Sequence, residues 1–434
     1  MKKYLFFALA AAGMLSSCTS DDIVSDKNAN LDNNELVPIR IGMGQKIQTT
    51  RGTGTVGGFD NATDNKWAQQ KVNVYMLEKG TMTLANDAEN NIAYQNQMFY
   101  TPDAAPSGIA TPGDNSIKYY NPQGKFDFWG YRLDDAVTEG EPVEGEENIT
   151  VNFKINGSQD VMVAKAVPTE DELDALENAR TPAVASDRDR AYSAFAARHG
   201  LQPDLEFRHL LSRLTFQVIP GSASAIDPAS PVVVDGIKVV SPDKGTLYIA
   251  STGDVAGETQ RIEWDAESTD EMTLMQRDGT AEDNLVAFQS VDLSDLSTYV
   301  EADNAESGRM LGEALLVAPD VTSYDIIITL HQPSLKSLEA GAEPENIEYT
   351  YETKIPAPVV MDPENPENVL TNTFVEGYSY NVKITLWGLT DIQVTTTLDE
   401  WKDGGEIELS PEDEERNNEE EETPAPEPEP EPEP

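Results

Sequence analysis

Residues 37–43 have the sequence Val-Pro-Ile-Arg-Ile-Gly-Met, with an apolar side chain at every second position. Successive side chains of a β-strand point to opposite faces of its sheet, so this alternation predicts a strand with one buried face. The predicted buried row consists of Val37, Ile39, Ile41 and Met43. Residues 71–77 and 125–131 repeat the pattern, which indicates that strands of this kind build the fold.

Short strand candidates continue along the chain, separated by Gly, Pro, Asn and Asp, and long amphipathic helices are scarce. That arrangement is typical of antiparallel sandwiches and barrels. The further candidates are residues 149–155, 160–164, 214–219, 232–240, 246–249, 325–330, 347–353, 379–386 and 392–398. We therefore expect a mainly β protein with antiparallel, β-sandwich-like domains in both halves of the chain.

One stretch, between Thr169 and Gly200, carries helical signals. Thr169 and Glu172 have the spacing of a capping box, and Ser186 precedes a run in which Phe195 shares an apolar face with neighbouring alanines. We expect two short helices here. They form either a connector between two β domains or a helical insertion inside one domain.

The charge and cysteine content exclude several classes of protein. The chain has 434 residues, with 78 acidic and 30 basic side chains and a formal net charge of -48. Such a surface repels phosphates, so no nucleic-acid partner is expected. The single cysteine, Cys18, excludes an intramolecular disulfide and a multi-cysteine zinc site, and the three histidines are not close-spaced. No metal site and no cofactor are predicted.

The N-terminus has the features of a bacterial export signal. Lys2 and Lys3 precede an apolar stretch over residues 4–15, which is too short to span a bilayer core and is expected to be removed. Leu-Ser-Ser-Cys at residues 15–18 resembles the bacterial lipobox, in which the cysteine is acylated. The alternative is an ordinary signal peptide with an incidental cysteine. The acidic pair after Cys18 is similar to the surface-export signal of Bacteroidetes lipoproteins.

The C-terminus is an acidic, proline-rich tail that closes with the repeat PAPEPEPEPEP. Like charges and proline rings keep such a segment extended and solvated, so a spacer is favoured over a specific binding motif. The predicted organisation is a signal peptide over 1–17, a flexible leash over 18–35, an N-terminal β domain over 36–168, a helical connector over 169–204, a C-terminal β domain over 205–410 and a disordered tail over 411–434.

Three segments together resemble a known family. They are residues 125–131 (KFDFWGY), 160–164 (DVMVA) and 207–216 (FRHLLSRLTF), and a closing Trp401-x-x-Gly404-Gly405 follows them. Their order, together with the lipobox, resembles the fimbrillin-like proteins of Bacteroides and relatives, which are subunits of type V pili. The resemblance covers about residues 36–410 and implies transthyretin-like β-sandwich domains without enzymatic activity.

In that family the subunit reaches the cell surface as an outer-membrane lipoprotein. An Arg-specific or trypsin-like protease then cuts after an arginine and releases the first strand. A strand from a neighbouring pilin subunit fills the groove, and the fimbrium grows by repetition. The resemblance thus implies that Val37, Ile39, Ile41 and Met43 plug an acceptor groove.

Arg51 is the predicted processing site, because it lies in a Gly- and Thr-rich stretch that a protease can thread. Arg40 competes with it but lies within the predicted strand, where backbone pairing would shield it.

The candidate donor strand lies near the C-terminus, where Ile392, Val394 and Leu398 share one face. That face alternatively packs within its own domain. The long tail beyond it departs from the pattern of stalk subunits and leaves an anchor, tip or accessory role open.

Other kinds of site have weaker support. His209 precedes an apolar run and has no nucleophile motif beside it, which favours a structural histidine over a catalytic base. The aromatic residues Trp129, Tyr131, Tyr119 and Tyr120 would stack on a sugar if they were exposed. The alternative function is accordingly a surface lipoprotein that binds glycans without polymerising, and host glycans or proteins are further candidate partners.

Overall fold

The computed structural model describes residues 36–45, 69–102, 108–133, 137–254, 261–277, 285–296, 308–334, 346–362, 365–389 and 392–399. The chain divides into two compact units, residues 1–35 and 36–434, and every described residue belongs to the second. The predicted signal peptide, leash and acidic tail lie outside the described residues.

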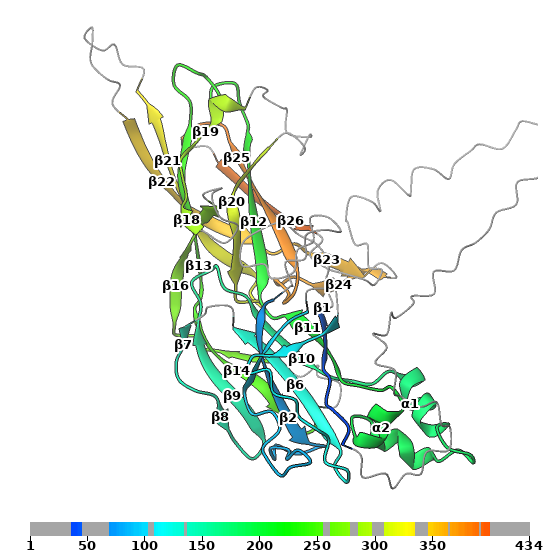
Figure 1. Cartoon of the computed structure of the whole chain (residues 1–434). Coiled ribbons are helices and arrows are strands. Elements are labelled where there is room, and N and C mark those ends of the chain that lie inside the picture. Colours follow the sequence, from blue (N-terminus) through cyan, green and yellow to red (C-terminus); the bar gives the residue numbers. More distant parts are fainter. Residues whose placement is uncertain are drawn as a thin grey trace, which may run out of the picture. The chain divides into compact units, whose positions relative to one another are not determined.

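The described part is mainly β (Figure 1), as the sequence predicts. Its first sheet has eight strands. In spatial order these are β4 (Gly108–Ile109), β1 (Gly42–Gln45), β11 (Asp204–His209), β10 (Val161–Lys165), β6 (Phe126–Leu133), β2 (Lys71–Glu78), β3 (Gln97–Tyr100) and β5 (Thr111–Pro112). All neighbours are antiparallel except β1 and β11, which run parallel.

A second sheet shares a buried core with one face of the first. Its strands are β15 (Ile262–Trp264), β14 (Lys244–Ser251), β9 (Asn148–Lys154) and β7 (Val137–Thr138), and β8 (Val143–Glu144) also pairs with β9. Tyr75 and Trp129 of the first sheet and Val151 and Leu247 of the second lie in one apolar cluster. The two sheets therefore form the sandwich that the alternating pattern predicts.

Two further sheets share the same core. One is ordered β20 (Arg309–Val317), β12 (Ser212–Pro220), β25 (Ser379–Leu386) and β26 (Ile392–Asp399). The other is ordered β16 (Thr269–Thr273), β13 (Val233–Pro242), β21 (Ser323–Pro333) and β22 (Asn346–Pro356), with β19 (Val291–Asp292) beside β13. Two short pairs complete the strands: β17 (Met275–Arg277) with β18 (Leu285–Ala287), and β23 (Val360–Asp362) with β24 (Asn365–Thr371).

The sheets do not follow the predicted boundary near residue 205. β11, which begins at Asp204, pairs with β10 and β1. β14 returns to pair with β9, about a hundred residues earlier in the chain. The alternation of side chains shows which face of a strand is buried but not which strand lies beside it, so the sequence could not reveal these pairings.

The helical stretch covers the opposite face of the first sheet. α1 (Glu170–Glu177) has the predicted capping box, since the Thr169 hydroxyl accepts from the Glu172 N–H and the Glu172 carboxylate accepts from the Thr169 N–H. The expected cap at Ser186 is wrong. Residues Ala185–Arg190 form a 3-10 helix, and Ser193 caps α2 (Ala194–Arg198) instead. A second 3-10 helix spans Leu293–Asp295.

The helical stretch packs on the sheet through its own apolar side chains. Leu176 and Phe195 lie in a second buried cluster with residues of β1, β2, β6 and β11. Within the described part of the chain, no helix has the length and apolar character that crossing a membrane requires.

Candidate functional site: the slot of the first strand

The segment over residues 36–45 lies inside the first sheet rather than at its edge. On one side the Ile39 N–H donates to Lys118 O at 2.8 Å, and the Val37 carbonyl accepts from Tyr120 N at 2.9 Å. The regular strand β1 begins only at Gly42, five residues after the predicted start, and Pro38 forms an isolated bridge with Tyr119. Proline has no N–H, and the two hydrogen bonds that flank this bridge come from its neighbours Ile39 and Val37 instead.

The other side of the segment is held by the residues that lead into β11. The Gly42 N–H donates to Pro203 O at 2.9 Å, and Gly42–Gln45 then pair in register with Asp204–Phe207. β4 pairs with the segment on the side away from β11, the same side as Lys118 and Tyr120, and there the Ala110 N–H donates to Ile41 O at 2.9 Å. We call the space between β11 and residues 108–120 the slot, because the first strand fills it completely.

The side chains predicted to face inward do so. Ile39, Ile41 and Met43 are 7%, 1% and 0% exposed, and Val37 packs against the same apolar cluster. The inward wall includes Leu205 and Phe207 of β11, with the helical stretch above it in the same cluster. The sequence analysis did not assign these two residues to the slot, although their own alternation indicates a strand.

The outward face of the same segment is polar. Arg40 is exposed, and Gly42 and Gly44 stand opposite Asp204 and Glu206, whose side chains are also exposed. The first strand therefore has an apolar row that fits the slot and an outward row that meets acidic neighbours.

The candidate donor strand is part of its own sheet in this structure. β26 pairs with β25 over its whole length, from Ile392 opposite Leu386 to Asp399 opposite Ser379. Ile392 and Val394 are partly buried against the larger core, and the backbone of Leu398 lies opposite Tyr380. This arrangement agrees with packing inside its own domain. β26 is nevertheless the outermost strand of its sheet, so its release would leave β25 and β12 paired.

The predicted lipidation and processing sites, Cys18 and Arg51, lie outside the described residues, as does Trp401.

His209 has a structural partner. Its Nδ1 lies 2.5 Å from Asp160 Oδ2, and both side chains are buried in the first sheet. A buried histidine in contact with a buried carboxylate, without an accessible substrate position, fits a packing role.

Three of the four aromatic residues considered for sugar stacking are unavailable for it. Trp129, Tyr131 and Tyr120 are 1%, 6% and 1% exposed, so the sequence-based suggestion is wrong for them. The Trp129 ring instead makes two cation–π contacts: Lys165 Nζ lies 4.4 Å and the Arg261 guanidinium 5.0 Å from the ring centre. Tyr119 alone is partly exposed.

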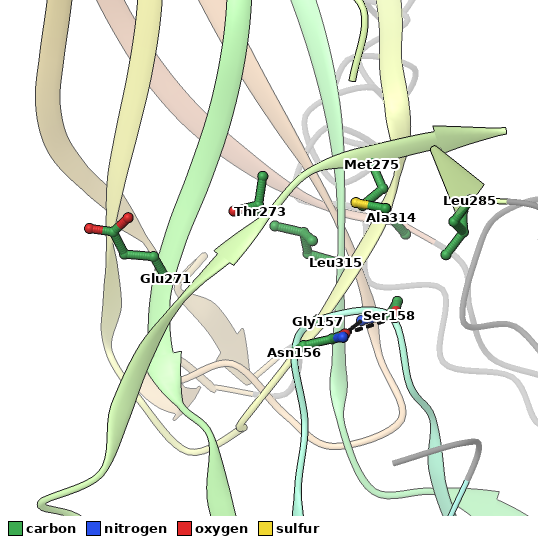
Figure 2. A pocket seen from close by; sticks show the side chains of 9 residues that line it. All are labelled: Asn156, Gly157, Ser158, Glu271, Thr273, Met275, Leu285, Ala314 and Leu315. Atoms are coloured by element: carbon green, nitrogen blue, oxygen red, sulfur yellow. Dashed lines mark hydrogen bonds between the residues drawn. The ribbon is translucent and has the colours of Figure 1, made fainter. Parts of the chain in front are cut away.

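A separate cavity of about 200 Å³ lies where the loop after β9 meets β16, β17, β18 and β20 (Figure 2). Its lining is mixed in polarity and comprises Asn156, Gly157, Ser158, Glu271, Thr273, Met275, Leu285, Ala314 and Leu315. Figure 2 shows the Ser158 hydroxyl bonded to Asn156, and the Glu271 carboxylate pairs with Lys238 Nζ at 2.6 Å. Asn156 and Ser158 thus bond each other, Glu271 bonds a residue outside the lining, and no function was predicted here from the sequence.

The sheets, the shared core and the filled slot define a structural β protein. Its family follows from comparison: the chain belongs to the fimbrillin-like family, which matches residues 61–401. It is accordingly a fimbrial or adhesion subunit of the cell surface and not an enzyme. No curated protein matches the chain.

Solved structures with similarity to this chain include a "putative cell adhesion protein" from Bacteroides uniformis, with 15% identity, a TM-score of 0.41 and coverage of 85% of this chain and 99% of that chain. Another is the fimbrial anchor protein Mfa2 from Porphyromonas gingivalis, with 9% identity, a TM-score of 0.32 and coverage of 84% and 98%.

Proposed function

We propose that this protein is a type V pilus subunit that is exported as a lipoprotein on Cys18, trimmed after Arg51 and assembled by strand exchange. In this proposal residues 37–43 occupy the slot only until trimming. A strand from a neighbouring subunit then replaces them, and the acyl chains on Cys18 leave with the released segment.

The observation that carries the proposal is the position of the first strand. It is held by backbone hydrogen bonds on both sides and by alternate buried side chains, which is the geometry of strand addition. The connection from Gln45 to Gln69 contains Arg51, so one cut there separates the strand from the rest of the chain.

Energetics explain why an emptied slot would bind a new strand. Burying one large apolar side chain contributes roughly 1.5–3 kcal/mol. Ile39, Ile41 and Met43 are nearly completely buried, so losing them would cost roughly 5–9 kcal/mol. That is comparable to the whole stability of a typical domain, about 5–15 kcal/mol. A trimmed subunit therefore gains much by accepting an apolar, alternating strand from a neighbour.

The geometry of exchange also predicts a filament. A strand donated by one subunit to the slot of the next is a head-to-tail contact, which repeats without closing. β26 remains the candidate donor, and its position at the edge of its sheet supports this role because it is paired with one strand only, β25; its release would also give up the packing of Ile392 and Val394 against the core.

The test uses the full-length precursor with Cys18→Ala, which keeps it soluble. Limited treatment with an Arg-specific protease, which spares the nearby Lys46 and Lys66, should remove the N-terminal segment after Arg51, as intact mass shows, and ladders should then form on a denaturing gel run without boiling. Arg51→Gln should abolish both effects, whereas Arg40→Gln should leave both intact. Clean trimming without any polymer, under conditions that include a second subunit, would contradict strand exchange.

A further inference from the structure

The outward row of the first strand meets β11 in a fixed register. Gly42 stands opposite Asp204, and Gly44 stands opposite Glu206. The inward pockets hold Ile39, Ile41 and Met43 and select strands with alternating apolar residues. Among strands that share this alternation, the outward positions can add discrimination, because charge and size differ there.

Asp204 lies directly over the glycine that it faces. A Cβ atom built at position 42 would be 2.6 Å from Asp204 Oδ1 and 3.1 Å from its Cγ. The resident strand thus leaves room for the carboxylate by having no side chain there. A longer residue at this position would require Asp204 to rotate, which a side chain at the surface can do.

Within the described part of the chain, Asp204 has acidic rather than basic neighbours. Asp204 forms no ion pair with any described residue, and the carboxylates of Glu206 and Glu172 are near enough to act on it electrostatically. Partial burial and these two neighbours raise the pKa of Asp204, as expected for an acid without a cationic partner.

Building on the proposed strand exchange, we infer that Asp204 is a specificity-determining residue of the slot. It favours a strand with a basic side chain in register with position 42, tolerates glycine, and disfavours an acidic residue. Opposite charges on directly paired positions stabilise antiparallel and parallel neighbours alike, and like charges destabilise them. A basic strand would gain here an ion pair that the resident glycine cannot make.

The charge of this chain's own donor candidate points to a different subunit as the partner. Placing Ile392, Val394 and Leu398 in the positions of Val37, Ile39 and Met43 puts Asp399 opposite Glu206. That register sets two like charges against each other. The slot therefore fits an extended strand from another subunit, with a lysine or arginine on its outward face, better than a second copy of this chain.

The test measures the resident strand in the intact chain. Full-length variants Gly42→Ala, Gly42→Lys and Gly42→Asp are compared by hydrogen exchange at the Ile39 amide, which is bonded to Lys118 O and is lost when the strand detaches. The alanine variant gives the steric effect alone. We expect exchange to be about tenfold slower in the lysine variant than in the aspartate variant, which corresponds to about 1.4 kcal/mol. In an Asp204→Asn background the difference should fall below about twofold.

Equal exchange rates for lysine and aspartate, or a difference that survives Asp204→Asn unchanged, would overturn the inference. Peptides of residues 36–45 with glycine, lysine or aspartate at position 42 give an independent readout: they compete for trimmed precursor from which the protease has been removed, and the same order is expected. If a variant fails to fold, the order of the peptides decides the role of Asp204, and equal binding by the lysine and aspartate peptides would overturn it. Absence of binding by every peptide would contradict the exchange itself, and the rates in the variants that fold would then decide the role of Asp204.

Discussion

Ile41→Ala is the substitution that best isolates the contribution of the first strand. Ile41 is 1% exposed and lies in the cluster beneath the slot, so its truncation leaves a cavity between β11 and the helical stretch. Replacing a buried isoleucine by alanine costs about 2–5 kcal/mol. The proposed exchange requires that the strand detaches without unfolding the rest, and on that basis we expect the loss to appear as easier detachment. A value near 3 kcal/mol raises the detachment constant about 100-fold.

Native-state hydrogen exchange measures that constant directly. The amides of Ile39 and Gly42 donate to Lys118 O and Pro203 O across the two walls of the slot, so both exchange when the strand leaves. Arg40→Ala is the matched control, since it lies in the same strand with an exposed side chain, and surface substitutions usually change stability by less than about 0.5 kcal/mol. The reasoning fails if Ile41→Ala leaves both amides unchanged, or if Arg40→Ala accelerates them equally.

Three further substitutions test other parts of the structure. Asp160→Ala removes the carboxylate that bonds the buried His209 ring and should cost about 1–3 kcal/mol in urea unfolding; a loss below about 0.5 kcal/mol would show that the pair is unimportant. Thr169→Ala removes the cap of α1 and should cost about 1 kcal/mol in thermal unfolding, whereas Thr169→Ser should cost little. Cys18→Ala should move the exported protein from the detergent phase to the aqueous phase, and continued membrane retention would argue against acylation.

The strands themselves follow from local pattern. Residues 71–77, 125–131 and 379–386 alternate apolar and polar side chains, and the structure has strands at Lys71–Glu78, Phe126–Leu133 and Ser379–Leu386. The capping box at Thr169 was equally visible, because a cap depends on residues only three apart. For the second helix the sequence predicted a start after Ser186, whereas the structure has Ser193 as its cap.

The amino-acid sequence by itself indicated many of the longer strands, which of their faces are apolar, and that the first strand has a buried row, but it did not single out β11 or β20. Only the tertiary structure decided that this strand lies between β4 and β11, that it runs parallel to β11, and that Gly42 faces Asp204. The physical reason is that strand alternation is a short-range property, whereas pairing between positions some 160 residues apart is settled by competition among all strands for neighbours.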